Sequence, residues 1–151
     1  MFGVRVNAMK VKYQDSITYK MLERLAKMPA KVILRADFDG LGDIRQITRG
    51  LTALIKQNRL VRIGSGVYAK AYRSTIDPKR TLIEGGADIA FRETLDRLGV
   101  NWEPGSSEQM YNARQTTQIP ARNIVRLKSR FRRKISYQKK QLIYEDKINA
   151  R

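Results

Sequence analysis

One part of this chain restricts its possible folds more than any other. It is a predicted amphipathic helix, followed directly by a short hairpin with glycines at its tip. Between residues 43 and 57 the apolar side chains fall on one helical stripe, formed by Ile44, Ile47, Leu51, Leu54 and Ile55. Residues 60–63 and 67–70 then resemble two strands, and Gly64-Ser65-Gly66 supplies the permissive backbone of a tight turn. A hairpin directly after a helix with a polar outer face is typical of a wing beside a recognition helix. The pattern therefore indicates duplex DNA as a partner.

The residues before this helix complete the outline. Asp15 or Ser16 can cap a first helix that Pro29 stops, and its buried stripe is Ile17, Met21, Leu22, Leu25 and Met28. A short second helix is predicted over residues 35–42, and Asp43 is suited to cap the third. We thus predict a winged helix-turn-helix domain over residues 15–72, made of three helices and a β-hairpin wing, after a basic arm at residues 1–14.

The second half reads as a separate small unit. Residues 73–81 are predicted to be a linker, and residues 82–151 a basic α+β domain. Its helix is expected over residues 87–98, with Phe91, Leu95 and Leu98 in register and Gly99 as the stop signal. Three short strands are expected around residues 124–127, 135–137 and 142–144, paired antiparallel. The predicted fold class is therefore α+β, a winged helix-turn-helix followed by a helix-plus-antiparallel-strand unit.

Charge is distributed by segment along the chain. The 151 residues carry a formal net charge of +17, with a pI near 10.5. Residues 1–81 have 17 basic and 6 acidic side chains, residues 82–110 have 2 and 6, and residues 111–151 have 12 and 2. Two basic regions thus flank an acidic middle. A balance of this kind makes a phosphate backbone the default partner.

The absence of two residue types excludes several kinds of catalytic and metal site. The chain has no cysteine and no histidine, which excludes Cys-His and Ser-His-Asp catalysis and zinc sites of the Cys/His kind. The acidic residues Glu84, Asp88, Glu93 and Asp96 cluster in the sequence, but no base or nucleophile accompanies them. Asp88, Glu93 and Asp96 are interpreted as the polar side of the helix. No apolar run approaches the ~20 residues that span a bilayer. We expect a cytoplasmic protein that is not an enzyme, binds no cofactor or metal and does not contact a membrane.

The predicted DNA contacts fall into two groups. On the third helix, Arg45 and Arg49 could read guanine, Gln46 could pair with adenine, and a threonine could touch a phosphate or a thymine methyl. Other basic residues would follow the phosphate backbone. The full predicted set is Arg35, Arg45, Gln46, Thr48, Arg49, Thr52, Lys56, Arg59, Arg62, Ser65, Lys70, Arg122, Arg130, Arg132 and Arg133. Arginines on a helix surface are also often only a solvated face, and the cluster at residues 130–134 could equally keep a strand edge soluble.

Three stretches resemble one protein family. The segment from residue 49 to residue 68 is similar to the "L..L...G.L.RI.RGVY" core of the AbiEi-type antitoxins and related winged-helix regulators of bacterial type IV toxin–antitoxin operons. Residues 90–105 and 116–122 resemble that family's "A..LG....PSG" and "STQVPAR" segments, in the same order. Ser65 stands where the family wing usually has arginine.

The resemblance implies an autorepressor that binds the operator of its own operon, with a nucleotidyltransferase-like toxin as a possible partner. Because the family generally continues into a further region credited with opposing the toxin, the resemblance favours DNA binding over neutralisation. One winged helix covers only a short half-site. Either a homodimer on an inverted repeat or the basic C-terminal unit is then expected to extend the contact, and a fragment ending near Thr81 should still bind DNA. The alternative function is an RNA-binding or ribosome-associated adaptor.

Overall fold

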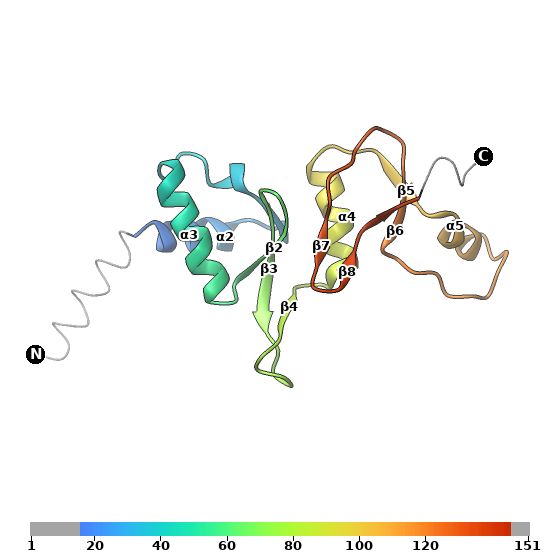
Figure 1. The fold of residues 1–151 in the computed structure, drawn as a ribbon, viewed down its shortest axis with the longest axis horizontal. Helices are drawn as coiled ribbons and strands as arrows, with labels where there is room; N and C mark the ends of the chain where they lie inside the picture. The colour runs from blue at the N-terminus through green and yellow to red at the C-terminus, as the bar shows by residue number, and fades with distance from the viewer. Residues whose placement is uncertain (1–15, 146–151) are drawn as a thin grey trace, which may run out of the picture.

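The computed structural model describes residues 16–145, which form a mixed α+β fold. Figure 1 shows an elongated molecule, with helices toward one end, a sheet beside them, a further helix on the other side of the sheet and the C-terminal elements at the other end. The basic arm expected at residues 1–14 lies outside the described residues. Within residues 16–145, no helix combines the length and the apolar character that crossing a membrane requires.

The first helices begin where their caps were predicted. Ser16 accepts a hydrogen bond from the Tyr19 N–H at 3.2 Å and starts α2 (Ile17–Lys27). Asp43 accepts from the Gln46 N–H at 2.8 Å, while Gln46 Oε1 accepts from the Asp43 N–H at 2.9 Å, so a capping box starts α3 (Ile44–Lys56). The short second helix is a single 3-10 turn, η1 (Arg35–Phe38), which follows β1 (Val32–Leu34).

The hairpin after α3 belongs to a four-stranded sheet. Strands β2 (Leu60–Gly64) and β3 (Val67–Arg73) form the predicted hairpin, and β3 also pairs with β1 and with β4 (Thr81–Ile83). All these pairs are antiparallel. Arg73 pairs with Thr81, so residues 73–81 do not form the expected linker. They are the ends and the turn of a second hairpin.

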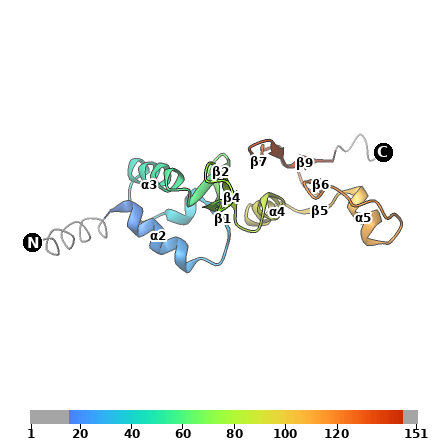
Figure 2. The same ribbon diagram turned by 90° about the horizontal axis from the view of Figure 1, so that it is seen from below.

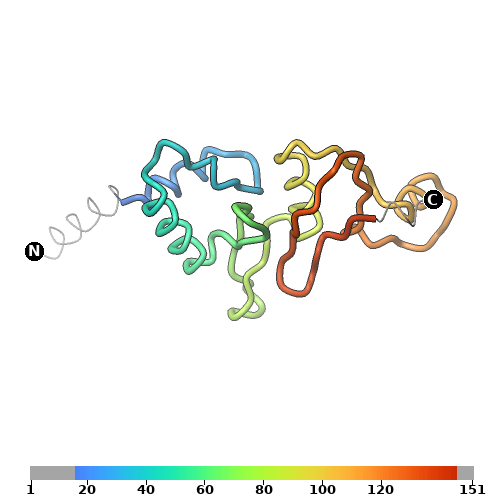
Figure 3. Tube along the Cα trace, turned by 45° about the horizontal axis from the view of Figure 1, so that its top comes forward, coloured from blue at the N-terminus to red at the C-terminus, as the bar shows by residue number. Residues whose placement is uncertain are grey.

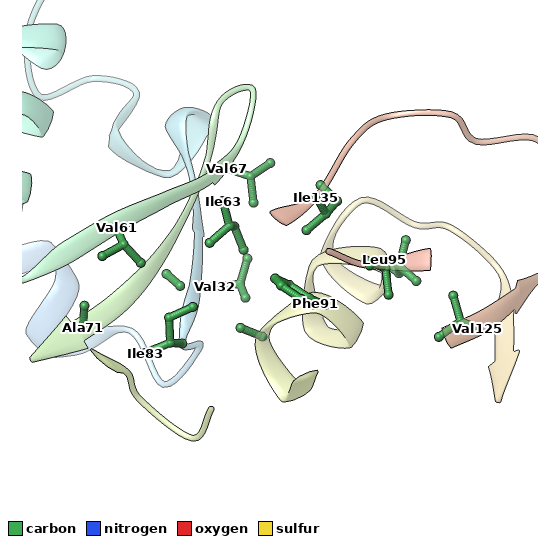
Figure 4. Packing of buried hydrophobic residues seen from close by; sticks show 13 residues of the cluster. Val32, Val61, Ile63, Val67, Ala71, Ile83, Phe91, Leu95, Val125 and Ile135 are labelled. Carbon is green, nitrogen blue, oxygen red and sulfur yellow. The ribbon is translucent and has the colours of Figure 1, made fainter. Parts of the chain in front are cut away.

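The two faces of this sheet pack into two cores. Because side chains alternate along a strand, Ile33 and Tyr68 face α2 and α3, whereas Val32 and Val67 face the opposite side. The second core continues into α4 (Ala87–Arg97) through Phe91, and beyond it to residues near the C-terminus (Figure 4). The sheet is therefore a middle layer between α2 and α3 on one side and α4 on the other (Figure 2).

The C-terminal half holds several elements that the sequence did not indicate. Strand β5 (Trp102–Pro104) and helix α5 (Ser106–Asn112) follow α4. The three predicted strands appear as β6 (Ile124–Leu127), β7 (Ser136–Tyr137) and β9 (Ile143–Tyr144), and an unpredicted strand, β8 (Lys140–Gln141), lies between the last two. β6 pairs antiparallel with β5 but parallel with β9. The expectation of purely antiparallel strands is therefore wrong.

The segment around residues 131–137 returns to the first hairpin, and Figure 3 shows it in red beside the green trace of that hairpin. Ile135 is fully buried in the same core as Val61 and Ile63 of β2. Gly64 permits this approach, because a Cβ there would lie 2.9 Å from Ile135 Cδ1. A domain boundary at residue 72 would therefore cut through one continuous core.

Candidate nucleic-acid interface

The outer face of α3 carries a stripe of basic and polar side chains. Arg45, Arg49, Thr52 and Lys56 recur every three or four residues and are all exposed. They lie opposite the buried residues of the helix, which are Ile47, Gly50, Leu51 and Leu54. Within residues 16–145, no hydrogen bond or ion pair engages the side chains of Arg45, Arg49 or Lys56. These three cations are therefore available to an outside partner.

Two residues of the predicted buried stripe lie on the exposed side instead. Ile44 is 78% exposed and Ile55 37% exposed, so their assignment to the core is wrong. Gly50 is instead one of the buried residues of the helix, and it lets α2 come close, because a Cβ at Gly50 would lie 2.2 Å from Met21 Sδ.

Arg35 connects the start of α3 to the turn of the β2–β3 hairpin. Its Nη2 donates to the Ile44 carbonyl at 2.9 Å and to Thr48 Oγ1 at 2.7 Å. Its backbone N–H donates to the Gly66 carbonyl at 3.0 Å. The Arg35 charge is thereby fixed between the first turn of α3 and the hairpin turn.

Two further arginines reach the hairpin turn from different parts of the sequence. Arg62 Nε donates to the Gly64 carbonyl at 3.2 Å, and the Arg133 guanidinium donates to the Ser65 carbonyl. Arg133 comes from the segment that the buried Ile135 anchors in the core. The turn at residues 64–66 is therefore bonded by basic side chains from β2 and the C-terminal segment, and by the Arg35 backbone N–H from η1.

Tyr144 holds the backbone of the Arg133 segment. Its hydroxyl donates to the Arg133 carbonyl at 2.5 Å, and its ring contacts Phe131 edge-to-face at 5.8 Å between centroids. Burial raises the pKa of Tyr144 to about 12, although the nearby Arg133 charge lowers it. The phenol is thus a neutral donor at physiological pH.

Lys70 does not face the proposed partner. Alternation along β3 places it on the same sheet face as Tyr68, toward α2. There its ammonium donates to the carbonyls of Leu25 and Met28 at 3.0 and 2.6 Å. It satisfies free carbonyls at the end of α2, so its prediction as a backbone contact of the wing is wrong. The alternation of β3 was the sequence signal that could have indicated this.

The basic C-terminal residues divide into paired and unpaired sets. Arg126 and Lys128 lie near Glu103, and Lys140 forms an ion pair with Asp88 at 2.8 Å. Residues 128–135 contain no strand, so the basic cluster at residues 130–134 does not lie on a strand edge. The remaining predicted contacts are exposed, namely Arg59, Arg122, Arg130 and Arg132.

The acidic residues of α4 have structural partners. Glu93 Oε2 accepts from the Val32 N–H at 2.6 Å, and Asp96 accepts from Trp102 Nε1 at 2.7 Å. On the same helix, Arg92 forms an ion pair with the buried Glu108 and lies 5.1 Å from the Trp102 ring centroid. Among residues 16–145, no three His, Cys, Asp or Glu side chains are grouped closely enough to hold a metal ion.

Comparisons with protein-family models, with curated proteins and with solved structures find no match to this chain.

Proposed function

We propose that this protein is a sequence-specific duplex-DNA-binding regulator that reads the major groove with α3. The observation that carries the proposal is the stripe formed by Arg45, Arg49, Thr52 and Lys56, whose three cations no residue within 16–145 engages. An α-helix fits the major groove, and arginine is suited to bidentate contacts with guanine O6 and N7. The stripe runs the length of the helix, so α3 can contact several base pairs.

The order of elements supports a winged helix-turn-helix as the framework. The chain runs α2, β1, η1, α3, β2, β3, and the strand order is β1-β3-β2. In this framework η1 and α3 form the helix-turn-helix, and the turn at residues 64–66 is the wing. Arg35 then contributes a phosphate contact between them.

The C-terminal segment supplies an arginine that the wing itself lacks. Ser65 occupies the position where the resembling family has arginine, and Arg133 bonds to the Ser65 carbonyl. Arg62 lies at the same turn. We assign Arg62 and Arg133 to phosphate contacts beside the wing, which fix register without reading sequence.

The operon that the chain would regulate is proposed from the sequence alone. On the resemblance of residues 49–68, 90–105 and 116–122 alone, the regulated operon is of the toxin–antitoxin kind and the chain acts as its autorepressor. A nucleotidyltransferase-like toxin is the partner that this assignment proposes. A toxin gene beside the gene for this chain would support it.

The proposal is tested by selecting bound duplexes from a random pool with the full chain, followed by salt titration of the selected duplex. We expect an enriched sequence and a strong salt dependence, because each neutralised phosphate contributes about −0.9 to the slope of log K against log salt. A pool without enrichment, together with a slope near zero, would remove the proposal. Tighter binding to structured RNA than to any duplex would favour the adaptor function instead.

A further inference from the structure

The turn of the β3–β4 hairpin is a second projecting tip, beyond the C-terminal end of α3 (Figure 1). Residues 74–80 form it, and they hydrogen-bond to one another. Ser74 Oγ accepts from the N–H groups of Ile76 and Asp77 at 3.2 and 3.1 Å, and Asp77 Oδ1 accepts from the Lys79 N–H at 3.1 Å. The Ser74 N–H donates to the Arg80 carbonyl at 2.8 Å. The tip is therefore shaped before any partner arrives.

The side chains at this tip combine one apolar group with several cations. Ile76 is 94% exposed, and Arg73, Lys79 and Arg80 are exposed around it. A single exposed apolar residue is common on protein surfaces. Ile76 lies on a preformed turn among three cations and one carboxylate. The tip is therefore suited to bind a polyanion that also has apolar groups to contact.

Hydrogen bonds fix the base of this hairpin to the residues that directly follow α3. Thr81 Oγ1 donates to Asn58 Oδ1 at 2.7 Å, and the Ala71 N–H donates to the Arg59 carbonyl at 3.0 Å. A shallow groove between the two elements is lined by Lys56, Arg59 and Arg73, among others. The basic surface of α3 thus continues onto the hairpin, at the opposite end of the helix from Arg35 and the turn at residues 64–66.

We propose that the β3–β4 tip inserts into the minor groove next to the major-groove segment that α3 reads, which extends the proposed DNA-binding function. Ile76 wedges against a base step, and Arg73, Lys79 and Arg80 contact the flanking phosphates. Apolar side chains on minor-groove binders act in this way, partly unstacking a step and bending the duplex. The preformed turn reduces the ordering cost of insertion. The footprint would then extend on both sides of α3, by residues 64–66 on one side and 74–80 on the other.

The test uses the full chain and a duplex that it selects from a random pool. Hydroxyl-radical footprinting maps the protected minor groove, and 2-aminopurine placed step by step through that groove reports unstacking. The variants are I76S and the double variant K79Q/R80Q. Their matched controls are I119S, whose isoleucine is 78% exposed in the segment between α5 and β6, and K20Q on the exposed surface of α2. All these residues are exposed, so the fold should persist.

We expect a rise in 2-aminopurine fluorescence at one flanking step with the native chain, and its loss in I76S but not in I119S. K79Q/R80Q should lose the flanking protection and should reduce the salt slope by about 1.8, which is two charges at about 0.9 each. If α3-dependent duplex binding persists while both variants keep the native footprint, fluorescence and slope, the hairpin inference is overturned and the DNA-binding function stands. If no duplex is bound at all, both are overturned.

Discussion

Arg97 and Asp37, 60 residues apart in sequence, are joined by two hydrogen bonds of 2.6 and 2.8 Å. Asp37 Oδ2 also accepts from the Leu34 N–H at 2.8 Å, and the Asp37 carbonyl accepts from Arg24. Asp37 therefore connects α2, η1 and α4. α4, which belongs to the second half of the chain, therefore holds in position the side of the molecule on which α3 lies.

Replacing Arg97 by methionine should lower the free energy of unfolding by ~2 kcal/mol, since hydrogen bonds to a charged group contribute ~1.5–3 kcal/mol and Asp37 would lose its partner. Urea denaturation measures the change. R45M is the control, because Arg45 is exposed and unpaired within residues 16–145, and it should change stability by less than ~0.5 kcal/mol. Equal stability of the two variants would contradict the role assigned to this contact.

A fragment that ends near Thr81 should not fold, contrary to what the sequence suggested. It would lack α4 and the C-terminal segment, which cover the sheet face formed by Val32, Val61, Ile63 and Val67. Exposing four such side chains costs ~6–12 kcal/mol at ~1.5–3 kcal/mol each, which is comparable to the ~5–15 kcal/mol stability of a whole domain. Circular dichroism during urea titration should give no cooperative transition. A sharp transition for the fragment would instead support an independent domain in the first half.

Local signals in the sequence predicted most helix boundaries. Ser16 and Asp43 cap their helices by contacts within three residues, and Gly99, with φ +72°, ends the turn after α4. The β2–β3 hairpin could be predicted equally well, because only Ser65 and Gly66 separate its two strands. Such features depend on neighbours in sequence, and the pattern alone therefore indicates them.

The features that escaped prediction depend on contacts between distant residues. The parallel pairing of β6 with β9, and the contact of Arg133 with Ser65, join segments that nothing local connects. Residues 73–81 contain turn-forming residues, yet β4 became a strand because Ile83 packs beside Ala71 in the shared core. Among the candidate DNA contacts, the stripe on α3 could be predicted from the sequence, because it follows from the periodicity of an α-helix. Alternation along β3 places Lys70 on the same face as Tyr68, but the packing of α2 against that face depends on distant residues.

Replacing Lys70 by methionine should affect stability and leave DNA binding unchanged. The ammonium satisfies carbonyls at the end of α2, and its loss should cost ~1–2 kcal/mol. Thermal denaturation tests the stability, and salt titration on a selected duplex should give the native slope. A slope reduced by about 0.9 would return Lys70 to the set of phosphate contacts.

Tyr144 should make the native state sensitive to alkaline pH. Its folded pKa of about 12 lies above the ordinary value of 10.0, so the neutral phenol favours the folded state fully below pH 10 and loses that contribution between pH 10 and 12. Y144F has no phenol to ionise. The difference in unfolding free energy between the native chain and Y144F should therefore shift against the native chain over this range. A constant difference from pH 9 to 12 would contradict the prediction.

Arg49 and Arg62 should differ in what they contribute to DNA binding. Arg49 lies on the outer stripe of α3, where a base contact contributes ~1–3 kcal/mol of discrimination, whereas Arg62 bonds to the hairpin turn at Gly64. Competition between the selected duplex and random duplexes separates the two roles. R49A should lower affinity for the selected duplex far more than for random DNA. R62A should weaken both by the same factor and reduce the salt slope by about 0.9, because it would remove the one phosphate contact proposed for Arg62. If R49A lowers both affinities equally, α3 binds the backbone and does not read the sequence.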